Sequence, residues 1–291
     1  MTVQTWDDGS LRGVRLATWN VNSALVRLPR LLPWLDERAP DVVCLQETKL
    51  TDEQFAENFD GPLAERGYRV AHVGEGRWNG VAILSKVGLD DVEPALPDVP
   101  AFNGRVEARA VTATCGDLRV TSVYVPNGRT PDDPHYAYKL EWLAALRAAV
   151  TKPGSAVVAG DMNIAATDAD VWNPALFTES THVTPPERKA LADLIGVGLH
   201  DVVRDRWPDE PHLYSYWDYQ KGRFHQDQGM RIDLVLAGDD PAGRVAAAWV
   251  DRQARKGKGP SDHAPVIVDL DTAPDGDIGP VVPPPSNPRR T

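Results

Sequence analysis

The chain has 291 residues, and its 31 Lys and Arg residues against 42 Asp and Glu residues give a formal net charge of −11. This acidic balance excludes a polycationic protein that coats nucleic acid, although it is compatible with a local basic face at a site that handles phosphates. A composition of 42% hydrophobic and 25% charged residues is that of a globular chain, and the length fits one large α/β domain with a sizeable core.

Residues 1–12 carry neither a basic segment nor an apolar run, so we expect a loose N-terminus and no leader peptide. No stretch of the chain approaches the ~18 consecutive apolar residues that a membrane helix needs. The two cysteines, Cys44 and Cys115, are far apart and surrounded by apolar residues, which is typical of small core side chains in a reduced protein. We therefore expect a cytoplasmic protein without a membrane contact.

The first predicted strand covers residues 14–19, a run rich in β-formers that ends at Asn20. Leucines then recur at three- and four-residue spacing, which is typical of one face of a helix. They are Leu25, Leu28, Leu31, Leu32 and Leu35. Pro29 fits a first helical turn, but Pro33 would disturb an established helix, so we expect a short or irregular element.

Residues 41–46 form a nearly continuous apolar run, typical of a strand buried on both faces, and Glu47 follows its C-terminal end. The prolines between 272 and 291 predict a disordered tail, so a single domain is expected over residues 13–271. The other predicted elements are strands over 68–73 and 81–84, a hairpin of 106–114 and 118–126, helices over 138–150 and 187–195, and strands over 156–159, 231–236, 245–250 and 265–270.

Six of the predicted strands lie next to acids, amides or histidine. The segments are TWNVN at 18–22, LQE at 45–47, YVPN at 124–127, GDMN at 160–163, RIDL at 231–234 and SDH at 261–263. Because Asn, Asp and Gly end strands for local reasons, each segment alone carries little information. Together they predict a rigid sheet system that gathers acids and amides at one rim, where binding sites are common.

Three carboxylates and two amides in these segments predict a metal site. Glu47, Asp161, Asp262, Asn20 and Asn22 offer hard oxygen ligands without a thiolate, a set that favours Mg²⁺, with Mn²⁺ as a substitute, over zinc. One metal is the economical interpretation, since Mg²⁺ keeps several waters and usually takes one or two protein carboxylates. The remaining acids are then free for catalysis.

His263 directly follows Asp262, so in an extended backbone their side chains face different ways and His263 needs another carboxylate partner. Asp233 is the best candidate. Such a pair fixes the tautomer of the imidazole and favours its protonated form, which suits the stabilisation of negative charge on a phosphoryl oxygen.

Seven motifs occur in a characteristic order across about residues 14–270. They are TWNVNS (18–23), PDVVCLQETKL (40–50), WNGVAILSK (78–86), VYVPNG (123–128), VVAGDMNIAATDAD (157–170), GMRIDLVLA (229–237) and PSDHAP (260–265). On these motifs the chain resembles the exonuclease–endonuclease–phosphatase superfamily of Mg²⁺-dependent phosphoesterases, and within it the exonuclease III-type abasic-site endonucleases. The resemblance implies a four-layered α/β sandwich of DNase I-like fold, with two packed mixed β-sheets flanked by helices. It also implies hydrolysis of duplex DNA 5′ to abasic sites and removal of nucleotides or blocking groups from 3′ ends.

The resemblance also implies a role for each matching residue. By this resemblance Glu47 is the principal metal ligand, with Asn22 and Asp262 near the metal and Asn20 in support. Asn163 holds a phosphate oxygen and Tyr124 approaches the phosphate. Asp233 orients His263, and Asp161 orients or deprotonates the attacking water. Asp161 is our choice for the proton acceptor because Asn163, two residues later, lies on the same side of the strand end.

Residues that recognise DNA are expected outside this cluster. Tyr214–Tyr219 carries four aromatic side chains, of which Tyr216 and Trp217 are candidates for stacking or for lining a sugar pocket that Met230 helps to close. Asn127 stands where relatives carry glutamine, so a groove contact there is expected to be shortened or lost. The basic run before SDH is expected to bind flanking phosphates through Arg252, Arg255, Lys256 and Lys258.

Two other functions are compatible with the motifs. One is a superfamily phosphoesterase that acts on a small phosphoester of the phosphoinositide or sphingomyelin type, against which the aromatic stretch and the basic run argue. The other is an inactive DNA-binding sandwich, against which the full set of acids and His263 argues. We expect a monomer. The sequence leaves open the balance of endonuclease and exonuclease activity, the metal used in the cell, action on RNA and protein partners.

Overall fold

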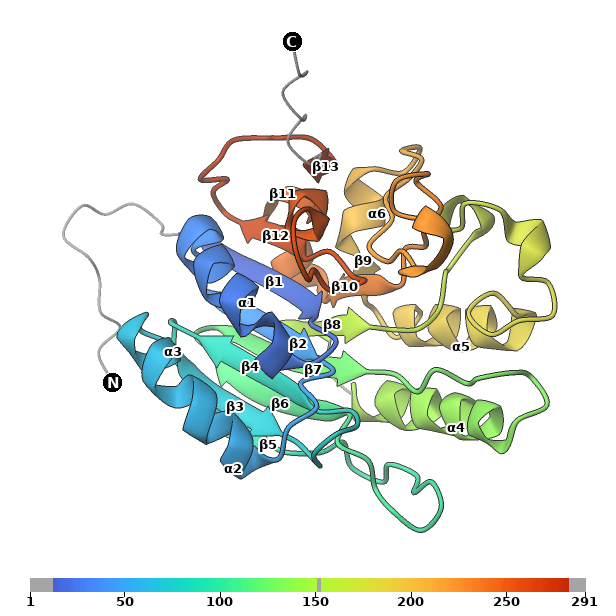
Figure 1. Cartoon of the computed structure of the whole chain (residues 1–291), viewed down its shortest axis with the longest axis horizontal. Coiled ribbons are helices and arrows are strands. Elements are labelled where there is room, and N and C mark those ends of the chain that lie inside the picture. The colour runs from blue at the N-terminus through green and yellow to red at the C-terminus, as the bar shows by residue number, and fades with distance from the viewer. Residues whose placement is uncertain (1–12, 151–152, 283–291) are drawn as a thin grey trace.

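Two β-sheets packed face to face, with helices on both outer faces, form the protein (Figure 1). The computed structural model describes residues 13–150 and 153–282, so the loose start predicted for 1–12 lies outside the described residues. The architecture confirms the predicted four-layered α/β sandwich with two mixed sheets.

Within the described residues the first sheet has the strand order β13-β11-β12-β1-β2-β4-β3, and the second has the order β5-β6-β7-β8-β10-β9. The strands of the first sheet are β1 (Val14–Asn20), β2 (Val42–Gln46), β3 (Arg69–Val73), β4 (Val81–Ser85), β11 (Val245–Asp251), β12 (Val266–Leu270) and β13 (Val281–Val282). Those of the second are β5 (Asp90–Glu93), β6 (Ala110–Cys115), β7 (Leu118–Tyr124), β8 (Ala156–Asp161), β9 (His200–Asp201) and β10 (Asp233–Ala237).

Side-chain alternation along the buried strands produces the layers. On β2, Val42 and Cys44 pack into the core between the sheets, whereas Val43 and Leu45 pack against the helices outside, which explains the continuous apolar run. The first sheet is covered by α1 (Ala24–Arg38), α2 (Asp52–Phe55), a π-helical turn (Ala56–Asp60) and α3 (Gly61–Glu65), and the second by α4 (Pro134–Ala149) and α5 (Pro185–Ile195). Two short helices, α6 (Val202–Arg206) and α7 (Asp239–Ala242), complete the fold.

Strand direction brings distant segments to one edge of the sandwich. The parallel pairs β1–β2 and β7–β8 place Asn20 beside Gln46, and Tyr124 beside Asp161. Strand β10 is antiparallel to β8, so its first residue, Asp233, pairs with Asp161. Strand β12 is antiparallel to β1, so the segment before it reaches the same edge.

Helix α1 differs from the short or irregular element expected from its prolines, because it runs for 15 residues through both of them. Pro29 and Pro33 lie on the exposed face of the helix. Proline has no backbone N–H, so the carbonyls that these two positions would otherwise bond are left free, and water can bind them on this face. The opposite side buries Leu31 and Trp34 against the sheet. Packing of this apolar face therefore outweighs the effect of the prolines.

The segment after residue 271 also differs from the prediction of a disordered tail. Val281 and Val282 form β13 and pair in parallel with Val250 and Asp251 at the edge of the first sheet. An unpaired strand edge and two β-branched residues outweigh the proline content here. Residues 283–291 lie outside the described residues. In the described part of the chain, no helix combines the length and the apolar character needed to cross a membrane.

Candidate active site

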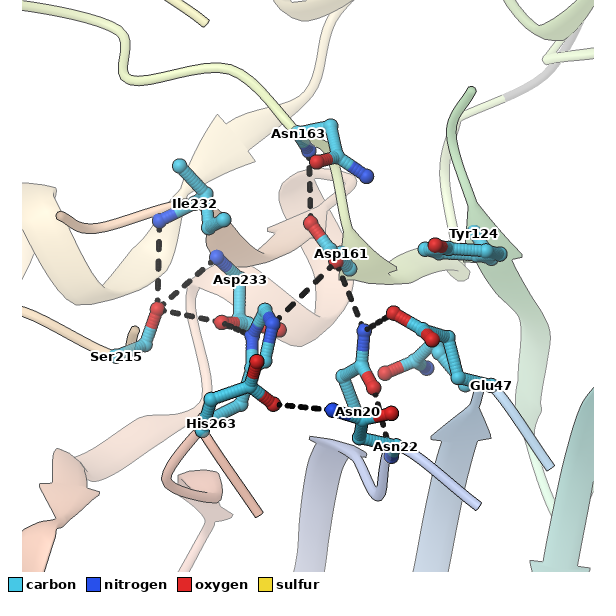
Figure 2. Close-up of polar contacts among 12 residues, drawn as sticks. Asn20, Asn22, Glu47, Tyr124, Asp161, Asn163, Ser215, Ile232, Asp233 and His263 are labelled. Atoms are coloured by element: carbon cyan, nitrogen blue, oxygen red, sulfur yellow. Dashed lines mark hydrogen bonds and ion pairs between the residues drawn. The ribbon is translucent and has the colours of Figure 1, made fainter. Parts of the chain in front are cut away.

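Asn20 links the two sheets at the edge where the strands converge (Figure 2). Its side-chain amide donates to Glu47 Oε1 at 2.8 Å and to Asp161 Oδ2 at 3.0 Å. Asn20 ends β1 and Glu47 follows β2 of the first sheet, whereas Asp161 ends β8 of the second. One buried amide therefore fixes the separation of two carboxylates.

The backbone turns Glu47 out of its sheet through an unusual conformation. Its φ of 53° lies in the left-handed region, which costs a residue other than glycine about 1–3 kcal/mol. The amide of Thr48 donates to the carbonyl of Gly80 at 3.1 Å and helps to hold this turn. A Cβ on Gly80 would lie 2.1 Å from Thr48 Oγ1, so the glycine of the WNG motif is required beneath the turn.

The ammonium of Lys49 contacts two of the residues predicted to hold a metal, Glu47 and Asn22. Lys49 Nζ lies 2.8 Å from Glu47 Oε2 and 2.6 Å from Asn22 Oδ1, while Asn22 Nδ2 donates to Asp262 Oδ1 at 3.0 Å. Burial alone would raise the pKa of Glu47, but Lys49 and the amide of Asn20 lower it below the usual value. These oxygen donors without a thiolate fit a hard divalent cation. Lys49 belongs to the LQETK motif, which is the signal that could have identified it.

His263 and Asp233 form the pair that the sequence predicts. His263 Nδ1 lies 2.8 Å from Asp233 Oδ2, and Ser215 Oγ donates to the same oxygen at 2.6 Å. Burial alone would lower the pKa of His263, but Asp233, Asp161 and Asp262 outweigh it and raise the pKa to about 10. The imidazole is therefore a cation at neutral pH. Ser215 carries no sequence signal beyond its place in the aromatic stretch.

Asp161 lies between this cation and the amide of Asn20. Its Oδ2 is 3.8 Å from His263 Nε2, and its Oδ1 accepts the backbone amide of Asn163 at 2.8 Å. Burial and the negative charge of Asp233 raise the pKa of Asp161 to about 7, against the opposing effects of His263 and the two hydrogen bonds. A base with a pKa near the working pH is well suited to proton transfer.

Asp161, Asp233 and His263 also offer three possible ligand atoms within 4.8 Å of one another. The Nδ1 atom of His263 and Oδ2 of Asp233 are engaged with each other, and the same Oδ2 accepts from Ser215. The oxygen set around Glu47 is therefore the better metal site.

Tyr124 and Asn163 complete the polar cluster at this edge of the sandwich (Figure 2). Its other members are Asn20, Asn22, Glu47, Asp161, Asp233 and His263. Burial, reinforced by Glu47, raises the pKa of Tyr124 far above its usual value, so its hydroxyl stays protonated and can donate. Asn163 has a φ of 50°, and its Nδ2 donates to Val125 O at 2.9 Å. The amide of Asn127 in turn donates to Asn163 Oδ1 at 3.2 Å.

A cavity of about 310 Å³ adjoins the cluster. Tyr216 and Met230, both predicted to recognise DNA, line it, and the ring of Tyr216 lies 4.8 Å from the ring of His263. Asn127 and His182 also line it. Trp217 does not: it is only 1% exposed and packs against Phe224 in the core. The prediction that Trp217 contacts DNA is wrong, because neighbouring residues of this extended segment face opposite sides.

The two arginines of the basic run before SDH contact other parts of the protein. Arg255 is buried and donates to the carbonyls of Ser261 and Trp217 at 2.5 and 3.1 Å, so the prediction that it binds phosphate is wrong. Arg252 is paired with Asp227 at 3.0 Å. Lys258 is exposed and Lys256 half-buried, so a phosphate contact by these two stays a prediction.

Two arginines without a predicted role, Arg129 and Arg105, line hollows beside the cluster. Arg129, whose side chain is 58% exposed, lines both the cavity beside Tyr216 and a second hollow of about 420 Å³. The second hollow also contains Arg105 and Trp78, the latter 68% exposed. A cation and an open aromatic ring next to buried acids are features that suit a phosphate backbone and its bases. A single arginine in a loop gives no sequence signal.

Comparisons with known proteins agree with this geometry. Residues 17–263 match the model of the Endonuclease/Exonuclease/phosphatase family. Exodeoxyribonuclease III of Haemophilus influenzae is 28% identical over 268 residues, which cover 87% of this chain and 98% of that protein. The structure of the 3′ phosphatase NExo from Neisseria, bound to a product DNA hairpin, matches with a TM-score of 0.84 at 35% identity, covering 89% of this chain and all of that one. An AP endonuclease from Archaeoglobus fulgidus matches with a TM-score of 0.83 at 33% identity, over 89% of this chain and 100% of that one.

Proposed function

The chain belongs to the endonuclease/exonuclease/phosphatase family and is a nuclease of the exonuclease III type, and on this basis we propose that it is a magnesium-dependent DNA-repair enzyme. It hydrolyses the phosphodiester 5′ to an abasic site and removes nucleotides or blocking groups from 3′ ends of duplex DNA. We further propose that it acts as a monomer in the cytoplasm.

The observation that carries the proposal is the contact of one amide, Asn20, with both Glu47 and Asp161, next to the cationic His263. Asp161 takes the proton of the attacking water, and His263 stabilises negative charge on the phosphoryl oxygens. Tyr124 and Asn163 donate hydrogen bonds to the phosphate. Glu47, Asn22 and Asp262 would hold Mg²⁺, which supplies Lewis-acid stabilisation of the phosphate when bound.

Two features favour DNA over a small phosphoester. The two hollows beside the cluster are lined by Arg129, Arg105 and the exposed Trp78, and these cations and this ring suit a phosphate backbone with its bases. Two of the similar structures are a 3′ phosphatase with bound DNA and an AP endonuclease.

A 5′-labelled duplex with one abasic analogue tests the proposal, because cleavage at the lesion and shortening from the 3′ end give products of different length. We expect both products with Mg²⁺, release of phosphate from a 3′-phosphorylated duplex, and none of these with EDTA. The Glu47→Gln variant is the matched control for contaminating nucleases. Phosphate release from soluble phosphoesters without DNA cleavage would establish the alternative function, and full activity in metal-free buffer would remove the metal from the scheme.

We expect Arg129→Ala to weaken binding of duplex DNA without regard to sequence and to lower the slope of log K against log salt by about one. The physical reason is that an exposed guanidinium beside the cluster contributes one phosphate contact. Fluorescence anisotropy at several salt concentrations measures the slope. Arg69→Ala is the matched control, because Arg69 is 60% exposed but lies at the opposite end of the first sheet. An unchanged slope would exclude Arg129 from the DNA interface.

A further inference from the structure

Behind the cluster, a buried lysine holds the backbone of two of its asparagines. We propose that the Lys139–Glu187 ion pair is a positioning device that aligns the side chains of Asn127 and Asn163 toward the phosphate of the DNA substrate. This inference rests on the proposed function, and it assigns a role in the reaction to residues that contact neither substrate nor metal.

The ammonium of Lys139 is surrounded by acceptors from both asparagine loops. Nζ donates to the backbone carbonyl of Asn163 at 2.8 Å, to that of Asn127 at 3.1 Å and to Glu187 Oε1 at 2.5 Å. The side chains of Lys139 and Glu187 are both 0% exposed. Helix α4 thus supplies the ammonium of Lys139 and helix α5 the carboxylate of Glu187, and both lie beneath the loops that carry Asn127 and Asn163.

Further hydrogen bonds tie the same two carbonyls to Glu187. Thr181 Oγ1 lies 2.6 Å from both Asn127 O and Glu187 Oε1. His182 Nδ1 lies 2.6 Å from Asn163 O, while the backbone amide of His182 donates to Glu187 Oε1 at 3.0 Å. The backbone position of each asparagine is therefore set by the ion pair and by residues that the ion pair holds.

The side chain of Asn127 lines the cavity beside Tyr216, whereas that of Asn163 is 4% exposed and donates through Nδ2 to Val125 O, which leaves one N–H of its amide for the phosphate. Asn127 Nδ2 donates to Asn163 Oδ1, and the backbone amide of Asn163 donates to Asp161 Oδ1 at 2.8 Å. Gly128 follows Asn127 with a φ of +92°, and a Cβ there would lie 3.1 Å from Lys139 Cδ and 2.7 Å from Thr181 Oγ1. The loop is thus packed directly on the lysine, and a shift of the ammonium is transmitted to Asn127.

Stability alone does not explain this ion pair. Transfer of two charges into a protein interior is costly, and apolar residues of similar volume often replace a buried pair without loss of stability. Apolar residues, however, cannot donate to the carbonyls of Asn127 and Asn163. The charged pair therefore fixes the backbone of Asn127 and Asn163, and through it the direction of their side-chain amides.

The test replaces both charges, since Lys139→Met alone would leave Glu187 buried without its partner and is expected to destabilise the fold. In the Lys139→Met/Glu187→Gln double variant both charges are removed, but the glutamine can still accept the amide of Thr184 in the capping box of α5. We therefore expect a folded protein with near-native DNA affinity, but a single-turnover cleavage rate reduced by about 10- to 100-fold. Lys189→Met, which removes an exposed lysine of α5, is the matched control.

Two readouts separate positioning from a merely structural role. Asn163→Ala should cost less in the double variant than in the wild type, because the amide is already misaligned there, and the side-chain NH₂ resonances of Asn127 and Asn163 should shift. A folded double variant that cleaves at the wild-type rate, full additivity with Asn163→Ala, or unchanged NH₂ resonances would overturn the inference. A wild-type protein that cleaves no DNA would instead refute the proposed function, and the resonances would still decide whether the ion pair sets the amides.

Discussion

Replacement of Asp161 by Asn is expected to abolish DNA cleavage while DNA binding persists. The amide keeps the volume of the carboxylate and can still accept the backbone N–H of Asn163, but it cannot take a proton from water. Loss of a general base typically lowers a rate by about 10²- to 10⁴-fold. Single-turnover nicking of an abasic duplex gives the rate, and anisotropy with the same duplex gives the affinity.

The matched control for this experiment is Asp209→Asn, which removes one negative charge from an exposed position. It separates the role of Asp161 from a general effect of charge on the binding of an acidic protein to DNA. If Asp161→Asn nicked DNA as fast as the wild type, another group would have to accept the proton. If it lost DNA binding together with cleavage, Asp161 would support the structure of the site.

The centre of the site could be predicted because buried strands leave a plain pattern in the sequence. The apolar run of β2 predicts a strand between two layers, and Glu47 follows it directly. Strand geometry excludes Asp262 as the partner of His263, since neighbouring residues of an extended chain face opposite sides, and the family resemblance implies Asp233 in its place. The hydrogen bond of 2.8 Å between these two side chains agrees with that prediction.

Other features depend on tertiary contacts that a single sequence does not reveal. Arg255 and Lys258 belong to the same basic run, yet only the packing decides that one guanidinium donates to internal carbonyls while the other cation faces water. Likewise, one residue of register determines that Tyr216 lines a cavity and Trp217 lies in the core. The prolines of α1 and of the segment before β13 were overestimated, because burial of an apolar face and the pairing of a free strand edge compensate for them.

Replacement of His263 by Gln is expected to slow cleavage by about 10²- to 10³-fold, the range found when one donor to a developing negative charge is removed. Glutamine can still donate a hydrogen bond, but it is neutral, so the comparison isolates the charge of the imidazolium. Single-turnover rates with the abasic duplex measure the effect.

Asp233→Asn gives the matching test of how that charge is maintained. Asp233 is the strongest of the carboxylates that hold the pKa of His263 at about 10, so the wild-type imidazole stays protonated across the neutral range and loses its proton only as the pH rises toward 10. Without the negative charge of Asp233 the pKa of His263 falls, and the decline of activity on the alkaline side should begin at lower pH. An NMR titration measures whether the pKa of His263 falls in Asp233→Asn. If it falls and the alkaline limb of the pH–rate profile still coincides with that of the wild type, the charge of His263 is not what stabilises the phosphate.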